Sequence, residues 1–185
     1  MKKHILLFFS LFALLQSCIP SLHPLYTPET LAFEPALLGT WKDKEGVYTF
    51  KEGKGKSYIL SYIEEGEEVA YRVHLVKLGD QYFFDFYTNK SADDIALGLS
   101  IAGFVPTHTF AKVKWAHNQL EISHFAEGEW LEELFEQRRI RIKHEVIDND
   151  IIVLTASPKE LQQFFLKYAD DPKAFTESSI WEKTL

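Results

Sequence analysis

The chain has 185 residues, a formal net charge of −7, 46% hydrophobic residues and one cysteine. Its length suits a single domain behind a leader, and its acidic balance, with no basic cluster between aromatics, argues against nucleic acid as a partner. A single cysteine excludes an internal disulfide. The 15% of aromatic residues can form a hydrophobic core large enough to fold without a structural metal ion.

The first 17 residues have the features of a lipoprotein signal peptide. A basic start is followed by an apolar run over 5–15, which is shorter than the about 20 residues of a membrane-spanning helix. Leu15-Gln16-Ser17-Cys18 then resembles the bacterial lipobox, with Leu three residues and a small residue one before the cysteine. This resemblance implies that Cys18 receives a diacylglycerol, with palmitate as the expected acyl group, and that cleavage occurs just before it.

Cys18 is therefore expected to attach the protein to a membrane. The alternative is a buried core thiol, but Cys18 stands at the expected cleavage point. Each buried methylene contributes about 0.8 kcal/mol, so two or three acyl chains anchor a protein stably. Ile19 replaces the aspartate of an inner-membrane retention signal, and no acidic run resembling a surface-export signal follows. These features favour the periplasmic face of the outer membrane.

After the signal peptide, residues 18–38 are predicted to form a tether and an N-terminal turn, because four prolines there disfavour strand pairing. Residues 39–185 are predicted to form one mainly β (α+β) domain. Alternating apolar residues and turn signals predict strands at 47–51, 58–63, 69–78, 81–87, 107–116, 120–125, 139–146, 150–155 and 180–184. Helices are expected at 91–102, at 128–137 and after Ser157-Pro158, where a capping box begins.

The strand at 81–87 is apolar on both faces, with Asp85 as the exception. Such a strand is expected to be covered on both sides. Gly79-Asp80 precedes it and predicts a two-residue hairpin turn from the strand at 69–78.

Gly39-Thr40-Trp41, directly after a predicted turn at 35–38, resembles the Gly-x-Trp signature of lipocalins. This resemblance implies an antiparallel lipocalin-like barrel or half-barrel, here with two or three short helices. In that family the Trp plugs the closed end of the barrel, and a basic side chain of the last strand stacks on it. Trp41 is the implied plug, and Lys183 is the basic residue on the predicted last strand.

Three wider segments resemble a group of uncharacterised bacterial lipocalin-like lipoproteins, and this resemblance implies no particular ligand. The segments are 22–27, 35–41 and 154–164, which include Leu22-His23-Pro24-Leu25-Tyr26-Thr27 and Leu154-Thr155-Ala156-Ser157.

Motifs for catalysis, cofactors and metals are not found. Four histidines fall in predicted strands, His74, His108, His124 and His144, but their spacing is not that of a metal site, and hydrogen-bonded strand histidines are the simpler interpretation. The sequence has no Gly-x-Ser-x-Gly elbow and no phosphate-binding loop. The aromatic residues are first of all core, but an eight-stranded barrel can also enclose a small ligand. The lining candidates are Tyr58, Phe84, Phe86 and Trp115.

The leading prediction is a non-enzymatic, lipid-anchored envelope protein that binds a small apolar or amphipathic ligand in its barrel, without a cofactor. The alternative is a structural or adaptor lipoprotein with a filled barrel that docks another envelope protein. A third possibility is an enzyme that acts on lipid or envelope material. A cavity with convergent polar groups would favour binding, whereas a filled interior with an exposed apolar patch would favour docking.

Overall fold

The structure is a computed structural model that describes residues 19–64, 66–88, 106–125, 128–137, 140–147 and 151–184. The signal peptide, Cys18 and the helix expected at 91–102 lie outside the described residues.

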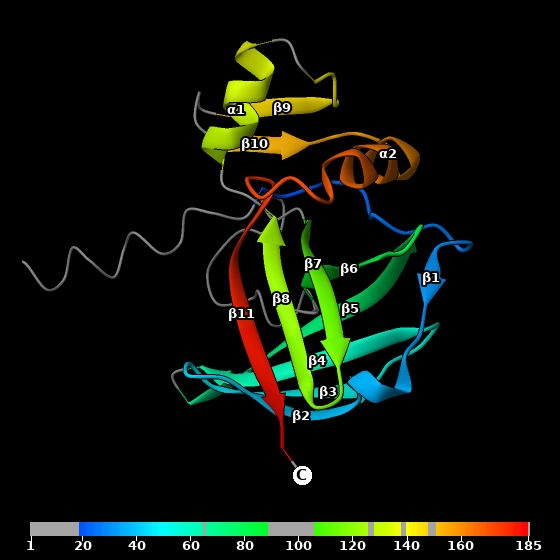
Figure 1. The fold of residues 1–185 in the computed structure, drawn as a ribbon, viewed down its shortest axis with the longest axis vertical. Helices are drawn as coiled ribbons and strands as arrows, with labels where there is room; N and C mark the ends of the chain where they lie inside the picture. The colour runs from blue at the N-terminus through cyan, green and yellow to red at the C-terminus, as the bar shows by residue number, and fades with distance from the viewer. Residues whose placement is uncertain are drawn as a thin grey trace, which may run out of the picture.

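Eight antiparallel strands form a closed barrel (Figure 1). Around the barrel their order is β5-β4-β3-β2-β11-β8-β7-β6, and β6 pairs with β5 to close it. The mainly β fold class is confirmed, and the barrel is complete rather than half. The strands are β2 (Gly39–Lys42), β3 (Val47–Glu52), β4 (Ser57–Glu64), β5 (Glu67–Leu78), β6 (Gln81–Thr88), β7 (His108–Ala116), β8 (Gln119–Phe125) and β11 (Phe175–Lys183).

The β5–β6 hairpin turns where the sequence predicted it. Leu78 pairs with Gln81, and Gly79 has a φ of +59°, which glycine adopts at no steric cost. Along β6, Phe84 belongs to the interior core, whereas Phe83 belongs to a second core outside the barrel wall. The expectation that this strand is covered on both faces is confirmed.

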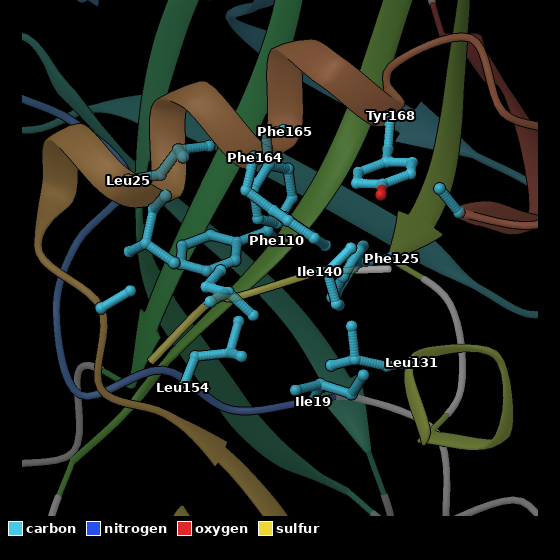
Figure 2. Close-up of a cluster of buried hydrophobic side chains, with 14 of the residues drawn as sticks. Ile19, Leu25, Phe110, Phe125, Leu131, Ile140, Leu154, Phe164, Phe165 and Tyr168 are labelled. Carbon is cyan, nitrogen blue, oxygen red and sulfur yellow. The ribbon is translucent and has the colours of Figure 1, made fainter. Parts of the chain in front are cut away.

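The outer core lies between the barrel and a layer formed by α1 (Gly128–Glu136), α2 (Pro158–Tyr168) and the hairpin of β9 (His144–Ile147) and β10 (Ile151–Leu154). Figure 1 shows this layer above the barrel, and Figure 2 shows the aromatic and aliphatic side chains packed within it. The Phe83 ring meets Phe165 of α2 edge-on, with centroids 5.8 Å apart. α2 begins as predicted, since Ser157 and Glu160 form a capping box.

The segment expected as a tether packs against the domain. Ile19, Leu25 and Leu37 are buried. Residues 19–26, which we call the strap, cross the outer layer, and Ser21 forms β-bridges to both His108 of β7 and Leu154 of β10. Further along, β1 (Leu31–Ala32) pairs with β5, and Pro35–Leu37 form the short 3₁₀ helix η2.

The strand predicted at 139–146 is correct only in its last part, because β9 covers His144–Ile147. Ile140 and Ile142 are buried as the alternation indicated, yet residues 140–143 are not part of a strand. The partner strand β10 ends at Leu154, since the chain then turns into the cap of α2. The alternation of apolar and polar residues therefore indicated correctly which side chains are buried, but it did not indicate whether residues 140–143 pair with another strand.

Among the described residues, no helix combines the length and the apolar composition needed to cross a membrane.

Candidate functional site

Trp41 of β2, the residue predicted to plug the barrel, is 1% exposed and belongs to the interior core. Its indole Nε1 donates a hydrogen bond of 2.8 Å to the Leu37 carbonyl oxygen of η2. Lys183 Nζ lies 5.1 Å from the centre of the Trp41 ring and donates to the Ala36 carbonyl oxygen at 2.6 Å. The contact implied by the lipocalin resemblance is therefore present between the first and the last barrel strands.

Gly39 is required for this arrangement. It has a φ of +116°, and a Cβ atom there would lie 3.3 Å from Lys183 Cε. Any side chain would be strained by the backbone and would crowd the lysine that covers Trp41. This is the physical reason for the glycine in Gly39-Thr40-Trp41.

Tyr58 and Trp115, two of the four candidate lining residues, do not line the barrel's open pocket. The Tyr58 hydroxyl accepts a 2.6 Å hydrogen bond from the Glu34 backbone N–H, and its ring stacks on Phe33 with centroids 4.9 Å apart. Trp115 packs edge-on against Tyr82. Both rings fill or flank the interior instead of facing free space.

Phe84 and Phe86 share the inward face of β6, as the two-residue period predicted, but they lie at different depths. Phe84 is fully buried and contacts Phe50 at 5.6 Å between ring centroids. Phe86, two residues further along, lines a pocket of about 510 Å³. Of the four candidates, Phe86 is the one that the structure places at this pocket.

This pocket is the open half of the barrel. Seven of the eight barrel strands contribute to it, and five lining side chains are aromatic. Its volume falls within the about 300–1,000 Å³ of small-molecule sites. The lining residues are Glu45, Gly46, Val47, Tyr48, Leu60, Tyr62, Ile63, Tyr71, Phe86, Thr109, Ile122, His124 and Trp181.

The pocket wall includes a rigid aromatic pair that sequence reasoning missed. Trp181 of β11 stacks on Tyr48 of β3, with ring centroids 3.9 Å apart and planes 8° from parallel. Trp181 lies two residues before Lys183 and so shares its strand face. That period, applied back from the predicted Trp41–Lys183 contact, was a signal for an inward Trp181.

The lining is apolar with a few polar groups. Glu45 is its one carboxylate, and Thr109 and His124 add polar atoms. Within the part of the chain that the structure describes, no lysine or arginine lines this pocket. The Glu45 side chain is 68% exposed and its Oε1 lies 3.5 Å from Lys44 Nζ, so its charge is offset and the lining suits a neutral amphipathic molecule.

A second polar cluster lies outside the barrel wall, beneath the strap. His108 Nδ1 and Asp85 Oδ1 are 2.6 Å apart, and the Leu25 backbone N–H donates to Asp85 Oδ2 at 2.7 Å. Asp85 is fully buried, and burial raises the pKa of its carboxyl group, against the opposing effect of these hydrogen bonds. A single carboxylate in an apolar strand requires hydrogen-bond partners when it is buried, but the sequence alone did not identify these partners.

His74 completes this cluster as the cross-strand partner of Asp85. Its ring centroid lies 4.2 Å from that of Tyr26 in the strap. Burial, with a smaller effect from Arg72, lowers the pKa of His74 to about 4. Among the described residues, its Nδ1 is a buried side-chain atom without a hydrogen-bond partner. The cluster fastens the strap to the barrel and is separate from the pocket lining.

The four strand histidines do not converge. His124 lines the pocket, His144 stacks on Phe135 at 3.7 Å, and His74 and His108 belong to the cluster under the strap. Over the described ranges, no group of three or more His, Cys, Asp or Glu residues is placed to hold a metal ion.

Comparisons of this chain with family models, with curated proteins and with solved structures gave no match. The resemblance to lipocalin-like lipoproteins therefore stays a prediction from the motifs, and the function is argued from the site.

Proposed function

We propose that this chain is a lipid-anchored protein of the bacterial cell envelope that binds a small apolar or amphipathic molecule in its barrel. The observation that carries the proposal is the pocket of about 510 Å³, whose lining is largely aromatic and aliphatic. A barrel used only as a support gains most stability from a filled interior, because cavities cost packing energy. Here the interior is filled around Trp41 and open around Trp181.

The lining indicates the chemical class of the ligand. Flat aromatic walls such as the Tyr48–Trp181 pair favour a ligand with an aromatic ring or a chain that lies along it. Glu45 at the pocket is paired with Lys44, so this edge offers a ligand little net charge. We therefore expect a neutral amphipathic ligand to bind better than an ionised fatty acid of the same length, whose carboxylate would lose hydration in an apolar pocket.

Ligand binding can be followed by the fluorescence of Trp181. The neutral probe N-phenyl-1-naphthylamine should bind, brighten and quench tryptophan emission by energy transfer. Trp181→Phe should remove much of this quenching, whereas Trp130→Phe, in the outer core, should leave most of it. If the folded protein binds neither this probe nor a neutral lipid from cell extract, the ligand-binding proposal is wrong. The alternative function, a structural or adaptor lipoprotein, would then be favoured.

The anchoring part of the proposal rests on Leu15-Gln16-Ser17-Cys18 after a short apolar run. Cys18→Ala should prevent lipid attachment and cleavage at this site, so the protein should keep the mass of its leader and lose its acyl chains. Intact-mass analysis of the membrane fraction measures both. A wild-type protein without fatty acid would end the lipoprotein proposal. The absence of an aspartate or an acidic run after Cys18 supports the periplasmic face of the outer membrane as the location in this proposal.

A further inference from the structure

The strap and β10 run side by side in the same direction. Ser21 and Leu154 form a parallel bridge, in which the Leu154 backbone N–H donates to the Pro20 carbonyl oxygen and the Leu22 N–H donates to the Leu154 oxygen, both at 2.9 Å. Because the two segments are parallel, the residues before Ser21 lie toward the residues before Leu154. Ile19 and Ile152 both enter the outer core, at 6% and 5% exposure.

This register places Ile19, the residue directly after Cys18, toward the beginning of β10. Cys18 is one peptide unit before Ile19, so their Cα atoms are about 3.8 Å apart. Figure 2 draws Ile19 within the outer core, so the part of the domain that the structure describes begins at the residue after Cys18. A lipid on Cys18 therefore holds this end of the β9–β10 hairpin at the membrane surface.

The same end of the hairpin is apolar and exposed. Ile147 and Ile151 are directly paired across the two strands and are 49% and 52% exposed. Val146, next to Ile147, is 54% exposed and points to the opposite face of the hairpin by strand alternation. We call these three residues the apolar end. Val146 pairs with Ile152, which enters the outer core, so Ile147 and Ile151 form the exposed apolar pair on the other face. Because a lipid on Cys18 would bring this end to the membrane, lipid is the occupant that we expect on that face.

We infer that the apolar end inserts into the membrane surface beside the lipid on Cys18. The inference rests on the proposed anchoring. It gives the protein a second membrane contact that fixes the orientation of the barrel, where acyl chains alone would leave it free to rotate. Since the chain is acidic overall, and Asp148 and Asp150 stand between the two strands in the sequence, the contact is with zwitterionic lipid.

Spin labelling can test this contact, because Cys18 is the one cysteine of the chain and lipid would block its thiol. Ile147→Cys and Ile151→Cys then each provide a single site for a nitroxide label on the mature, lipidated protein. Ile180→Cys is the matched control, since Ile180 is an equally exposed isoleucine, at 58%, on the barrel strand β11. Each protein is reconstituted into phosphatidylethanolamine–phosphatidylcholine vesicles. The collision rate of the nitroxide label with oxygen, which is concentrated in lipid, is then compared with its collision rate with a water-soluble nickel complex.

Labels at positions 147 and 151 should collide preferentially with oxygen, as in lipid, and the label at 180 with nickel, as in water. Nickel-accessible labels at all three positions would overturn the inference and leave the anchoring intact. Labelling of the wild-type protein would instead show that Cys18 has a free thiol, so anchoring itself would fail and the inference with it. Added phosphatidylglycerol should reduce the oxygen preference at 147, and an increase would contradict the charge argument.

Discussion

Lys183 Nζ lies 5.1 Å from the centre of the Trp41 ring, which connects the last strand of the barrel to the first. The same ammonium group donates to the Ala36 carbonyl oxygen of η2 at 2.6 Å. One side chain of β11 thus contacts both β2 and η2. Two residues earlier on β11, Trp181 stacks on Tyr48 and lines the pocket instead.

Trp41→Ala should reduce the free energy of unfolding by about 3–5 kcal/mol, the range for large aromatic truncations in a core. The indole is 1% exposed, and its Nε1 is hydrogen-bonded to Leu37. Urea denaturation measures the change. Lys183→Met keeps the aliphatic stem over the ring and should cost only about 0.5–1 kcal/mol. Equal midpoints for Trp41→Ala and wild type would show that the interior core does not depend on this residue.

Phe84→Asp and Phe86→Asp should have different effects, although both residues are on the inward face of β6. Phe84 is fully buried against Phe50, so a charge there should cost more than the about 3–5 kcal/mol of a Phe→Ala truncation and unfold the domain. Phe86 lines the pocket, so Phe86→Asp should keep the fold and weaken binding of the naphthylamine probe at least about tenfold.

Circular dichroism separates folding from binding in this pair of variants. A folded Phe84→Asp protein, or a Phe86→Asp protein with unchanged probe affinity, would contradict the depth difference between the two residues.

The candidate site was only partly predictable from sequence because periodicity gives the face of a strand and not the depth along the barrel. Tyr58 and Tyr62 alternate on the same face of β4, yet Tyr58 is buried near η2 and Tyr62 lines the pocket. Signals that depend only on neighbouring residues predicted the structure more accurately than the periodicity did. The capping box at Ser157 and the Gly79-Asp80 turn depend on neighbouring residues, and both were located correctly.

Pairs distant in sequence were not predictable. Asp85 was visible as the one carboxylate in an apolar strand, but its partner His108 is 23 residues further along and on another strand. Nothing local selects that histidine among the four in predicted strands. The strand at 139–146 failed for a related reason, because alternation at Ile140 and Ile142 reports a buried face whether or not a partner strand exists beside it.

Asp85→Asn should loosen the strap. The amide keeps the size of the carboxylate but replaces one of the two oxygens that contact His108 and the Leu25 N–H, so we expect a loss of about 1–3 kcal/mol, as for an impaired buried hydrogen bond. The Leu25 amide, which donates to Asp85, should exchange with deuterium faster than other strap amides. Asp80→Asn is the matched control, because Asp80 is exposed in the β5–β6 turn, and should change stability by less than about 0.5 kcal/mol.

Equal stability and equal exchange at Leu25 in the two aspartate variants would show that the strap is held by its apolar side chains alone. The outer core would then be the whole reason that the segment after Cys18 is ordered.

His74 should make the domain less stable as the solution becomes acidic. Burial lowers the pKa of His74 to about 4 in the folded protein, whereas an unfolded histidine titrates near about 6.5. Between these values the unfolded chain binds a proton that the folded one does not, so the free energy of unfolding falls as the pH drops from about 6.5 to about 4. Below about 4 both states are protonated, and this contribution is fully lost.

His74→Phe is the variant that isolates this effect. It keeps a ring against Tyr26 and removes the titrating group, so its unfolding free energy should depend less on pH than that of wild type. Asp85, whose pKa burial raises, is present in both proteins together with His108 and Arg72, so the difference between the two curves reports His74. That difference should change by on the order of 1–3 kcal/mol between pH 7 and pH 4, measured by urea denaturation at fixed ionic strength. Parallel curves would mean that His74 is accessible to water in the folded protein and that the strap does not seal it.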